Sequence, residues 1–377
     1  MQLAGVTEQL RQSTDSSGGR LLFVLSAVIT ITLTLFRWGG VSFFVSSPID
    51  TVPIDRLHVS DGRADESSCI NCHEQAEQFP ATGHANALRR STSPESRALL
   101  ADFGLCEPAG SEGTVVDIEA ALPRAENSSG ASEISLDWCF GSGRHARTWV
   151  ATLGDSQGAT DLLEFRWTWY RDVDGFDVTP GQPDKHFATH LGPFGVLYDH
   201  SKTRRCFACH SSYLAIDDGR LRFEDIETGV NCQRCHGPRA AHVASDGEIR
   251  DDFWQTASPI DAVNRCAQCH RRPEEVDADG LRADDPDLAR FQPVGLMRSK
   301  CFTVSQKMTC TTCHDPHRPL DVQDSLGDWQ CLQCHDPAET SDTRCGAGEP
   351  ENCLQCHMPK VHSTDPIHFT DHWIRVR

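Results

Sequence analysis

The chain has 377 residues with 54 acidic and 35 basic side chains, which gives a formal net charge of −19 at pH 7. A protein this acidic is not expected to bind nucleic acid, or anionic lipid through a basic patch. Only 38% of the residues are hydrophobic, and the mean hydropathy is −0.43. Both values are low for a chain that buries one large side-chain core.

The most apolar stretch of the chain lies near its N-terminus. Residues 1–20 are polar and are expected to be cytoplasmic, whereas residues 21–36 form an apolar run that residues 41–45 weakly continue. This length lies between a signal-peptide core and a full membrane span. We expect residues 21–45 to form an uncleaved signal anchor, a transmembrane helix that holds the remaining chain in the periplasm. A cleaved signal, which leaves a soluble periplasmic protein, is the alternative.

A linker and the first cysteine motif follow the apolar run. Residues 46–65 contain Pro, Asp, Gly and Ser and read as the linker. Residues 66–105 carry Cys69-Ile-Asn-Cys72-His73, and residues 81–90 are expected to form a short helix that contains His84.

The pentapeptide Cys-x-x-Cys-His occurs seven times in the chain, six of them after residue 200. Its cysteines are Cys69, Cys72, Cys206, Cys209, Cys232, Cys235, Cys266, Cys269, Cys310, Cys313, Cys331, Cys334, Cys353 and Cys356. The histidines that follow them are His73, His210, His236, His270, His314, His335 and His357.

This pentapeptide is the attachment signature of c-type haem. Its two thiols form thioethers with the vinyl groups of one porphyrin, and the adjacent imidazole becomes the proximal iron ligand. Structural zinc also uses Cys-x-x-Cys pairs, but it combines them in twos and does not require a histidine after each pair. The sequence therefore predicts seven covalently attached haem c groups. Because these groups replace much of a side-chain core, the apoprotein is not expected to fold.

Residues 106–180 contain no motif and have the pattern of a small antiparallel β insertion. The stretches 134–138, 148–153 and 162–170 alternate or cluster like strands, and glycine-containing turns separate them. Four tryptophans lie in these stretches, and we expect them to form the sheet core, with contact to a haem face as the alternative. They are Trp138, Trp149, Trp167 and Trp169.

Residues 181–377 are predicted to form a six-haem module of short helices and loops. The acidic run 272–288 is expected to be a solvated loop between the fourth and fifth haems. The predicted fold class is a mainly α and irregular multihaem cytochrome c with a haem-filled core, the small β insertion and the N-terminal helix.

The sixth ligand of each iron must come from the other histidines. Bis-imidazole ligation fills both axial positions of the iron, so that it passes electrons without binding substrate. His317 follows His314 by only three residues and cannot reach the opposite face of the same porphyrin, so it would serve a neighbouring haem. His368 and His372 have a spacing that favours one face of a helix.

Eleven histidines are free for this role. The candidate distal ligands are His84, His242, His317, His372, His200 and His368. His58 is expected to be a surface residue, and His145, His186 and His190 are not assigned. The eleventh is His362.

Four cysteines lie outside the motifs. Haem is attached outside the cytoplasm in bacteria, where disulfides also persist. Cys106 with Cys139 and Cys301 with Cys345 are the pairings considered, although sequence does not fix connectivity.

Several of these strings resemble a known family. Cys69-Ile-Asn-Cys72-His73, with His84 eleven residues after His73, is similar to the first haem and distal histidine of multihaem cytochromes related to the tetrahaem electron carrier of nitrifying bacteria. That cytochrome region also occurs fused to helical-repeat proteins. Residues 229–242, 308–317 and 353–372 resemble other segments of the family.

The resemblance covers residues 66–84 and 205–377 and implies closely stacked, mainly bis-His haems that transfer electrons. The family is distantly related to hydroxylamine oxidoreductase. This chain departs from such enzymes because it has seven motifs rather than eight and only three tyrosines to offer a haem crosslink. It also lacks the Cys-x-x-Cys-Lys variant of pentahaem nitrite reductases.

The expected function is electron transfer outside the cytoplasm, and no catalytic residue is assigned. The expected redox partners are a membrane quinol oxidoreductase or a periplasmic carrier. The alternative function is a multihaem oxidoreductase that acts on a small nitrogen or sulfur compound at one open haem, the first or the second. A structural or sensory subunit of a larger complex is the third alternative.

Overall fold

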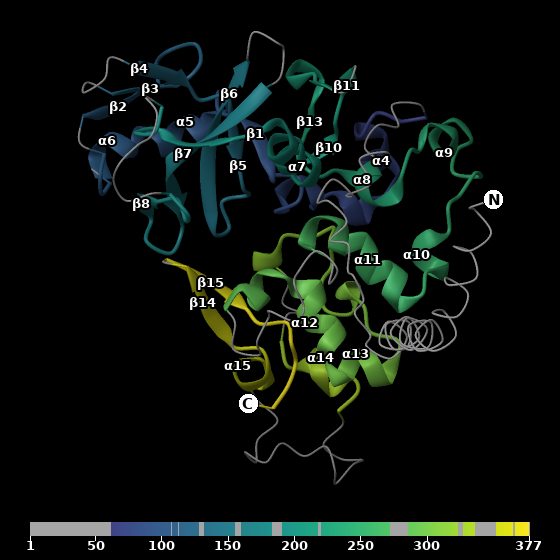
Figure 1. The fold of residues 1–377 in the computed structure, drawn as a ribbon. Helices are drawn as coiled ribbons and strands as arrows, with labels where there is room; N and C mark the ends of the chain where they lie inside the picture. Colours follow the sequence, from purple (N-terminus) through teal and green to yellow (C-terminus); the bar gives the residue numbers. More distant parts are fainter. Residues whose placement is uncertain are drawn as a thin grey trace, which may run out of the picture. The chain divides into compact units, whose positions relative to one another are not determined.

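The computed structural model describes the chain from residue 62 onward, with gaps (Figure 1). The described ranges are 62–106, 108–111, 113–127, 132–154, 160–182, 191–217, 220–271, 286–322, 327–335, 352–364 and 366–376. They all belong to the unit Ser47–Arg377. None of the described helices is long and apolar enough to cross a bilayer. The predicted cytoplasmic segment, the signal anchor and residues 46–61 of the predicted linker lie outside these ranges, as do His58, His186, His190 and Cys345.

The largest sheet has six antiparallel strands in the order β1-β5-β6-β7-β8, with β9 also paired to β7. The strands are β1 (Leu88–Arg90), β5 (Trp138–Phe140), β6 (Ala146–Gly154), β7 (Thr160–Tyr170), β8 (Gly175–Val178) and β9 (Gly195–Tyr198). The three stretches predicted as strands all contribute to β-structure. The sheet also takes β1 from the first haem segment and β9 from the six-haem segment, which ties both to the insertion.

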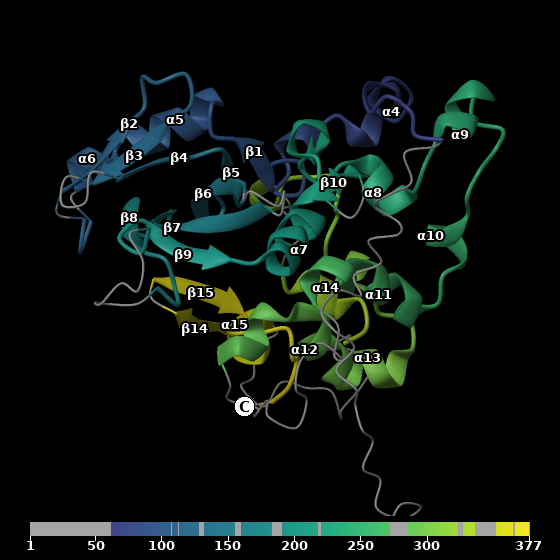
Figure 2. The same ribbon diagram turned by 45° about the horizontal axis from the view of Figure 1, so that its top comes forward.

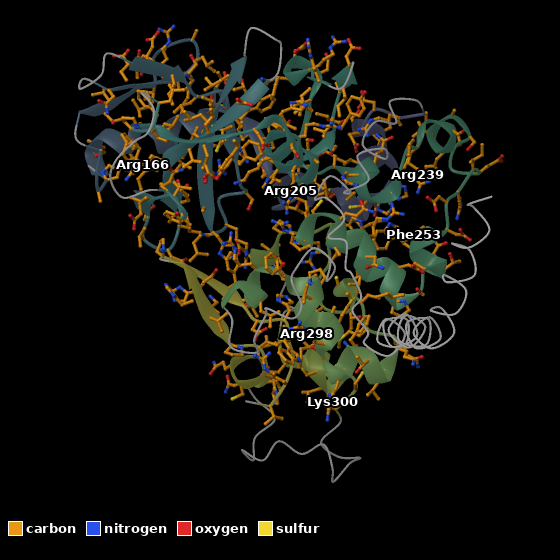
Figure 3. The ribbon with its side chains drawn as sticks, viewed as in Figure 1. Arg166, Arg205, Arg239, Phe253, Arg298 and Lys300 are labelled. Carbon is orange, nitrogen blue, oxygen red and sulfur yellow. The ribbon has the colours of Figure 1, made fainter. Side chains whose placement is uncertain are left out.

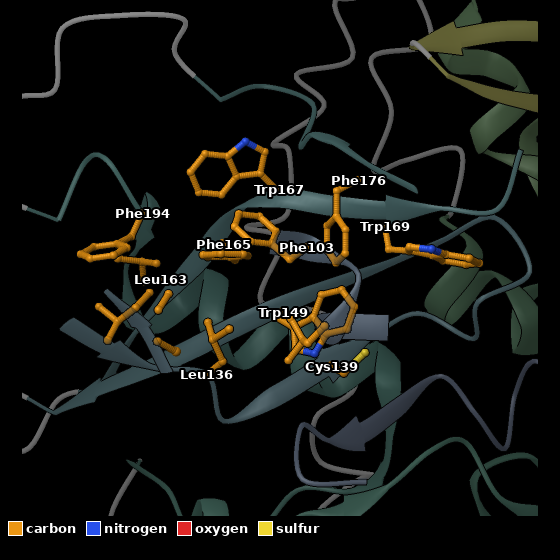
Figure 4. Packing of buried hydrophobic residues seen from close by; sticks show 14 residues of the cluster. Phe103, Leu136, Cys139, Trp149, Leu163, Phe165, Trp167, Trp169, Phe176 and Phe194 are labelled. Atoms are coloured by element: carbon orange, nitrogen blue, oxygen red, sulfur yellow. The ribbon is translucent and has the colours of Figure 1, made fainter. Parts of the chain in front are cut away.

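Each face of this sheet packs against its own cluster of apolar side chains, because successive residues of a strand point to opposite faces. Trp149 and Ala151 belong to one cluster, and Val150 between them belongs to the other. The first cluster is closed by helices α5 (Pro94–Ala101) and α6 (Phe103–Cys106) and is shown in Figure 4.

A three-stranded sheet also contributes to the first cluster, through Ala125 and Ile134. Its strands are β2 (Thr114–Asp117), β3 (Arg124–Asn127) and β4 (Ser132–Ser135).

The second cluster joins the sheet to α7 (His200–His210), the helix that carries the second Cys-x-x-Cys-His motif. Trp138 meets Phe207 of α7 edge to face, with ring centroids 5.3 Å apart. The four tryptophans of the insertion are buried, as predicted for a sheet core.

The remaining chain consists of short helices and two-stranded ribbons (Figure 2). The helices are α4 (Ser67–Cys72), α8 (Cys232–His236), α9 (Ala240–Ala244), α10 (Phe253–Thr256), α11 (Pro259–His270), α12 (Gln292–Arg298), α13 (Lys300–Ser305), α14 (Trp329–Leu332) and α15 (Cys353–His357). The 3-10 turns are η2 (Glu74–Ala76), η3 (Phe79–Ala81), η4 (Phe223–Asp225), η6 (Pro286–Arg290), η7 (Cys310–Thr312) and η8 (Leu320–Val322). The ribbons are β10 (Ser211–Tyr213) with β13 (Glu227–Thr228), β11 (Ile216–Asp217) with β12 (Arg220–Leu221), and β14 (Lys360–Thr364) with β15 (Ile367–Thr370).

Two predicted helices are wrong. His368 lies in β15, directly opposite His362, because the β-branched residues Val361 and Ile367 favour a strand and Pro366 disfavours a helix. Residues 81–90 form the end of η3, turns and then β1, since pairing with β5 recruits residues 88–90. The fold is therefore mixed α and β rather than mainly α.

Most of the predicted acidic loop, residues 272–285, lies outside the described ranges.

Candidate haem-binding cavity

One continuous cavity of about 3940 Å³ is lined by residues from all seven Cys-x-x-Cys-His motifs. Pockets for a single small molecule have volumes of roughly 300–1,000 Å³. The cavity is therefore large enough for several groups rather than one. We number the motifs one to seven by their histidines, which are His73, His210, His236, His270, His314, His335 and His357.

Short helical turns present the motifs to the cavity. Residues three apart lie on the same face of a helix, so a helical turn over Cys-x-x-Cys points both sulfurs the same way. In motif four, α11 begins after Ser258, whose hydroxyl accepts from the backbone of Asp261, and ends at the motif histidine, His270. In motif two, α7 begins after Asp199, whose carboxylate accepts from the backbone N–H of Lys202 at 2.8 Å.

Four motif histidines each face a second imidazole across a gap of nearly constant size. The ring centroids lie 6.2 Å apart for His73/His242, and 6.1 Å apart for His270/His84, His236/His317 and His314/His372. A metal–imidazole bond of about 2 Å puts the centres of two rings on opposite sides of one ion roughly 6.2 Å apart. The spacing of all four pairs fits one iron between the two rings.

The Nδ1 atoms of several of these rings bind protein oxygens. Nδ1 of His242 lies 2.8 Å from the carbonyl oxygen of Ile249, and Nδ1 of His372 lies 2.9 Å from that of Thr370. Two motif histidines have the same kind of partner, since His210 Nδ1 is 3.0 Å from the Ala87 oxygen and His357 Nδ1 is 3.0 Å from the Arg375 oxygen. Such a partner fixes the tautomer with Nδ1 protonated and leaves Nε2 as the metal-binding atom.

Burial keeps several of these rings neutral. It lowers the pKa of His84, His236 and His372 to about 4 in each case, and neighbouring histidines act in the same direction. Neutral imidazole is the form that binds a metal ion.

The cavity wall is basic although the chain as a whole is acidic. Among the described residues it has thirteen cationic side chains, and Arg239, Arg298 and Lys300 are labelled in Figure 3. They are Arg144, Arg234, Arg239, Arg250, Arg265, Arg271, Arg290, Arg298, Lys300, Lys307, Arg318, Lys360 and Arg375. Only Asp246, Asp251 and Asp315 oppose them. This excess of positive charge suits haem, because each porphyrin carries two propionate groups.

Cysteines of different motifs touch or lie close together. The thiols of Cys69 and Cys232 are in contact, which joins motifs one and three. The other thiol contacts are Cys209 with Cys269, Cys266 with Cys310, and Cys331 with Cys353. Three further pairs interact electrostatically, Cys235 with Cys266, Cys235 with Cys269, and Cys313 with Cys331.

The other candidate ligands have different surroundings. His200 opens α7 outside the cavity lining, and His368 faces His362 at 5.2 Å. His145 lines the cavity and packs on Phe369 at 5.3 Å. Within the described part of the chain, no second imidazole lies opposite His210, His335 or His357. The carbonyl groups that orient the rings were not found from the sequence, because backbone partners leave no residue signature.

The cysteines outside the motifs do not form the pairs that we considered. Cys139 and Cys301 are both free thiols. Cys139 is completely buried in the sheet core, where burial raises the pKa of its thiol to about 11. It is packed as a small apolar side chain.

The sequence family described as cytochrome c554 and c-prime matches residues 185–237, which contain motifs two and three. The fold is similar to that of the outer cell wall cytochrome OcwA, with a TM-score of 0.52 and 13% identity over 83% of this chain and 80% of that one. The chain is a multihaem c-type cytochrome. A curated relative of this cytochrome is the dissimilatory sulfite reductase MccA of Wolinella succinogenes, 23% identical across 45% of this chain. The match spans 30% of the length of that relative.

Proposed function

We propose that this cytochrome transfers electrons along seven covalently attached haem groups outside the cytoplasm. A haem iron held by two imidazoles cycles between ferric and ferrous and passes an electron without binding substrate. The observation that carries the proposal is the set of four imidazole pairs with ring centroids 6.1–6.2 Å apart.

The proposed ligand sets follow from these pairs. The two cysteines of each motif attach one porphyrin, and the motif histidine is its proximal ligand. The distal ligands are His242 for haem one, His317 for haem three, His84 for haem four and His372 for haem five. Each distal histidine comes from a segment outside the motif that it completes, so ligation ties distant parts of the chain together.

The contacts and electrostatic interactions between motif cysteines suggest the route of the electrons. They link the motifs in the order one, three, four, five, six and seven, and motif two branches from motif four. Cys72 of motif one, Cys334 of motif six and Cys356 of motif seven are exposed, whereas the thiols of motifs two to five are half-buried. Electrons would enter or leave through haem one at one end of the route and through haem six or haem seven at the other end.

The partners proposed for these ends are a membrane quinol oxidoreductase and a periplasmic carrier. The apolar residues 21–45 would anchor the cytochrome in the membrane beside the quinol oxidoreductase, with the haem domain in the periplasm. The acidic surface suits a basic soluble carrier.

The test starts from the mature protein exported by a host that attaches haem. Mass spectrometry should find seven added haem masses, and the ferric protein should give at least four low-spin centres in electron paramagnetic resonance. The His84/His270 centre should differ from the others, since its ring planes cross at 76° whereas those of His73/His242 differ by 16°. All haems should reduce and reoxidise reversibly in a potentiometric titration. Fewer haem masses, or haems that do not cycle, would refute the proposal.

A second candidate function is reduction or oxidation of a small oxyanion at haem two. No described imidazole lies opposite His210, and motif two is a branch rather than a link in the route. The basic cavity wall would draw in an anion, which the net charge alone did not suggest. The sulfite reductase relative points to a sulfur oxyanion as the compound.

Spectra decide between the two functions. An enzyme should have a high-spin ferric signal that changes when sulfite, nitrite or cyanide is added, and replacing His210 should remove that response. The enzymatic function is excluded if the wild-type protein is wholly low-spin and His186→Ala or His190→Ala creates a new high-spin haem. In that case every iron has two axial ligands and no haem has an open position.

A further inference from the structure

The C-terminal residues Asp371–Val376 lie against the end of α12. The Ser299 hydroxyl accepts from the backbone N–H of Ile374 at 2.8 Å and lies 3.3 Å from the carbonyl oxygen of His372. Ser299 is completely buried. The terminal segment is therefore held through its backbone by one side chain of the α12–α13 junction.

Gly295 makes this approach close. A Cβ atom at this position would lie 2.7 Å from the backbone nitrogen of Trp373 and 2.9 Å from the carbonyl carbon of His372. Both neighbours are backbone atoms, so a larger residue cannot be accommodated by rotating a side chain. Only glycine lets the terminal segment lie where it does.

Two haem-facing imidazoles depend on this segment. His372 stands opposite His314 at 6.1 Å, and the carbonyl oxygen of Arg375 lies 3.0 Å from Nδ1 of His357. An ion pair of 3.1 Å between Asp371 and Arg375 braces the segment internally, and Asp371 is buried. A shift of the segment would displace the imidazole of His372 and would remove the Arg375 carbonyl oxygen from Nδ1 of His357.

We propose that Gly295 and Ser299 are positioning residues for the ligands of two different haems. Through the terminal segment they place His372 as the distal ligand of haem five and orient His357, the proximal ligand of haem seven. Neither residue is itself a ligand. The inference rests on the proposed assignment of His372 as an axial ligand.

The experiment compares haem-loaded, full-length variants by electron paramagnetic resonance and by potentiometric titration. Gly295→Ala should convert one low-spin haem per chain to high spin and should shift the potential of a second haem. Free imidazole added in solution should restore the low-spin signal. Ser299→Ala should also increase the high-spin fraction of that haem. Ser299→Thr, which keeps the hydroxyl, should leave the haem low-spin.

Gly104→Ala is the matched control, because a Cβ atom at Gly104 would meet no other atom within 4 Å. Its spectrum should equal that of the wild type. If His372→Ala creates a high-spin haem and Gly295→Ala does not, the positioning role is wrong while the ligand assignment stands. If His372→Ala leaves every haem low-spin, the ligand assignment itself fails. Should Gly295→Ala yield no haem-loaded protein, a wild-type spectrum for Ser299→Ala refutes the inference.

Discussion

At the scale of single residues, the position of a histidine in the sequence does not tell which iron it can reach. His317 is three residues from His314, yet its ring faces His236, with an interplanar angle of 19°. Backbone turns at Asp315 hold it, since the Asp315 carboxylate accepts from the backbone N–H of His317 at 2.9 Å. One residue that follows the fifth motif would thus complete the third site.

His317→Ala should therefore create one high-spin haem, and it should be haem three rather than haem five. The measurement is the spin state of the ferric protein for His317→Ala alone, for His317→Ala combined with His236→Ala, and for His317→Ala combined with His314→Ala. The His317 effect should disappear when His236 is already replaced, and it should persist when His314 is replaced. His362→Ala is the control, because His362 is exposed and pairs with His368 across a ribbon. The opposite pattern would assign His317 to haem five.

A half-buried carboxyl group in the sheet should make stability depend on pH. Burial raises the pKa of Glu164, and its Oε2 accepts from the Tyr198 hydroxyl at 2.7 Å. The folded protein then holds this proton to a higher pH than the unfolded chain, whose Glu pKa is about 4.3. The stability that it contributes is complete below that pH and is lost as pH rises through the folded pKa.

Glu164→Gln should remove this dependence, because the amide keeps an acceptor for Tyr198 but does not titrate. Its denaturation midpoint, measured against the wild type, should rise as pH increases from about 4.3 through the folded pKa of Glu164. Glu119→Gln, at an exposed position, should track the wild type across the range. A constant difference at all pH values would contradict the prediction.

At the scale of elements, the six-stranded sheet is a core built from side chains alone. Phe103 from α6 meets Phe165, Trp167 and Phe176 with ring centroids 5.2–5.6 Å apart. These residues do not line the haem cavity. The opposite face of the sheet packs on α7, where Phe207 and Ala208 of motif two belong to the second cluster. This packing holds motif two against the sheet.

Phe103→Ala should destabilise the protein by about 3–5 kcal/mol, because Phe103 is completely buried and leaves a cavity. The haem absorbance and spin state of the folded variant should remain those of the wild type. Thermal denaturation followed by circular dichroism measures the first, and the haem spectrum measures the second. Leu105→Ala, at a position 82% exposed, should change stability by less than about 0.5 kcal/mol. Haem spectra that change with Phe103 would mean that the sheet core and the haem sites are coupled.

At the scale of the whole molecule, the two kinds of core are divided along the chain. Both hydrophobic clusters of the described residues lie between Leu88 and Ile226. Six of the seven motifs lie after residue 200, and the described chain beyond residue 226 contributes to neither cluster. The side-chain shortage inferred from composition is therefore concentrated in the C-terminal half, where porphyrin would fill the interior.

We therefore expect protein made without haem attachment to lose only part of its structure, which replaces the expectation from composition that the whole apoprotein does not fold. Limited proteolysis followed by mass spectrometry should leave fragments within residues 62–226 and digest residues 227–377. The haem-loaded protein should resist digestion in both regions. Equal digestion of both halves of the apoprotein would show that the sheet also needs haem to fold. Equal resistance would show that porphyrin is not needed as a core.

The sequence alone determined what is local. A Cys-x-x-Cys-His motif holds its attachment chemistry within five residues. The alternation and clustering of apolar residues around Trp149 and Trp167 predict strands there. Tertiary structure decided the partners of the motif histidines, the recruitment of β1 and β9, and the strand at His368 in place of a helix. Those features depend on contacts between residues far apart in the chain, and a distal imidazole is selected by where its backbone is held. Such placement leaves no mark in the spacing of the residues themselves.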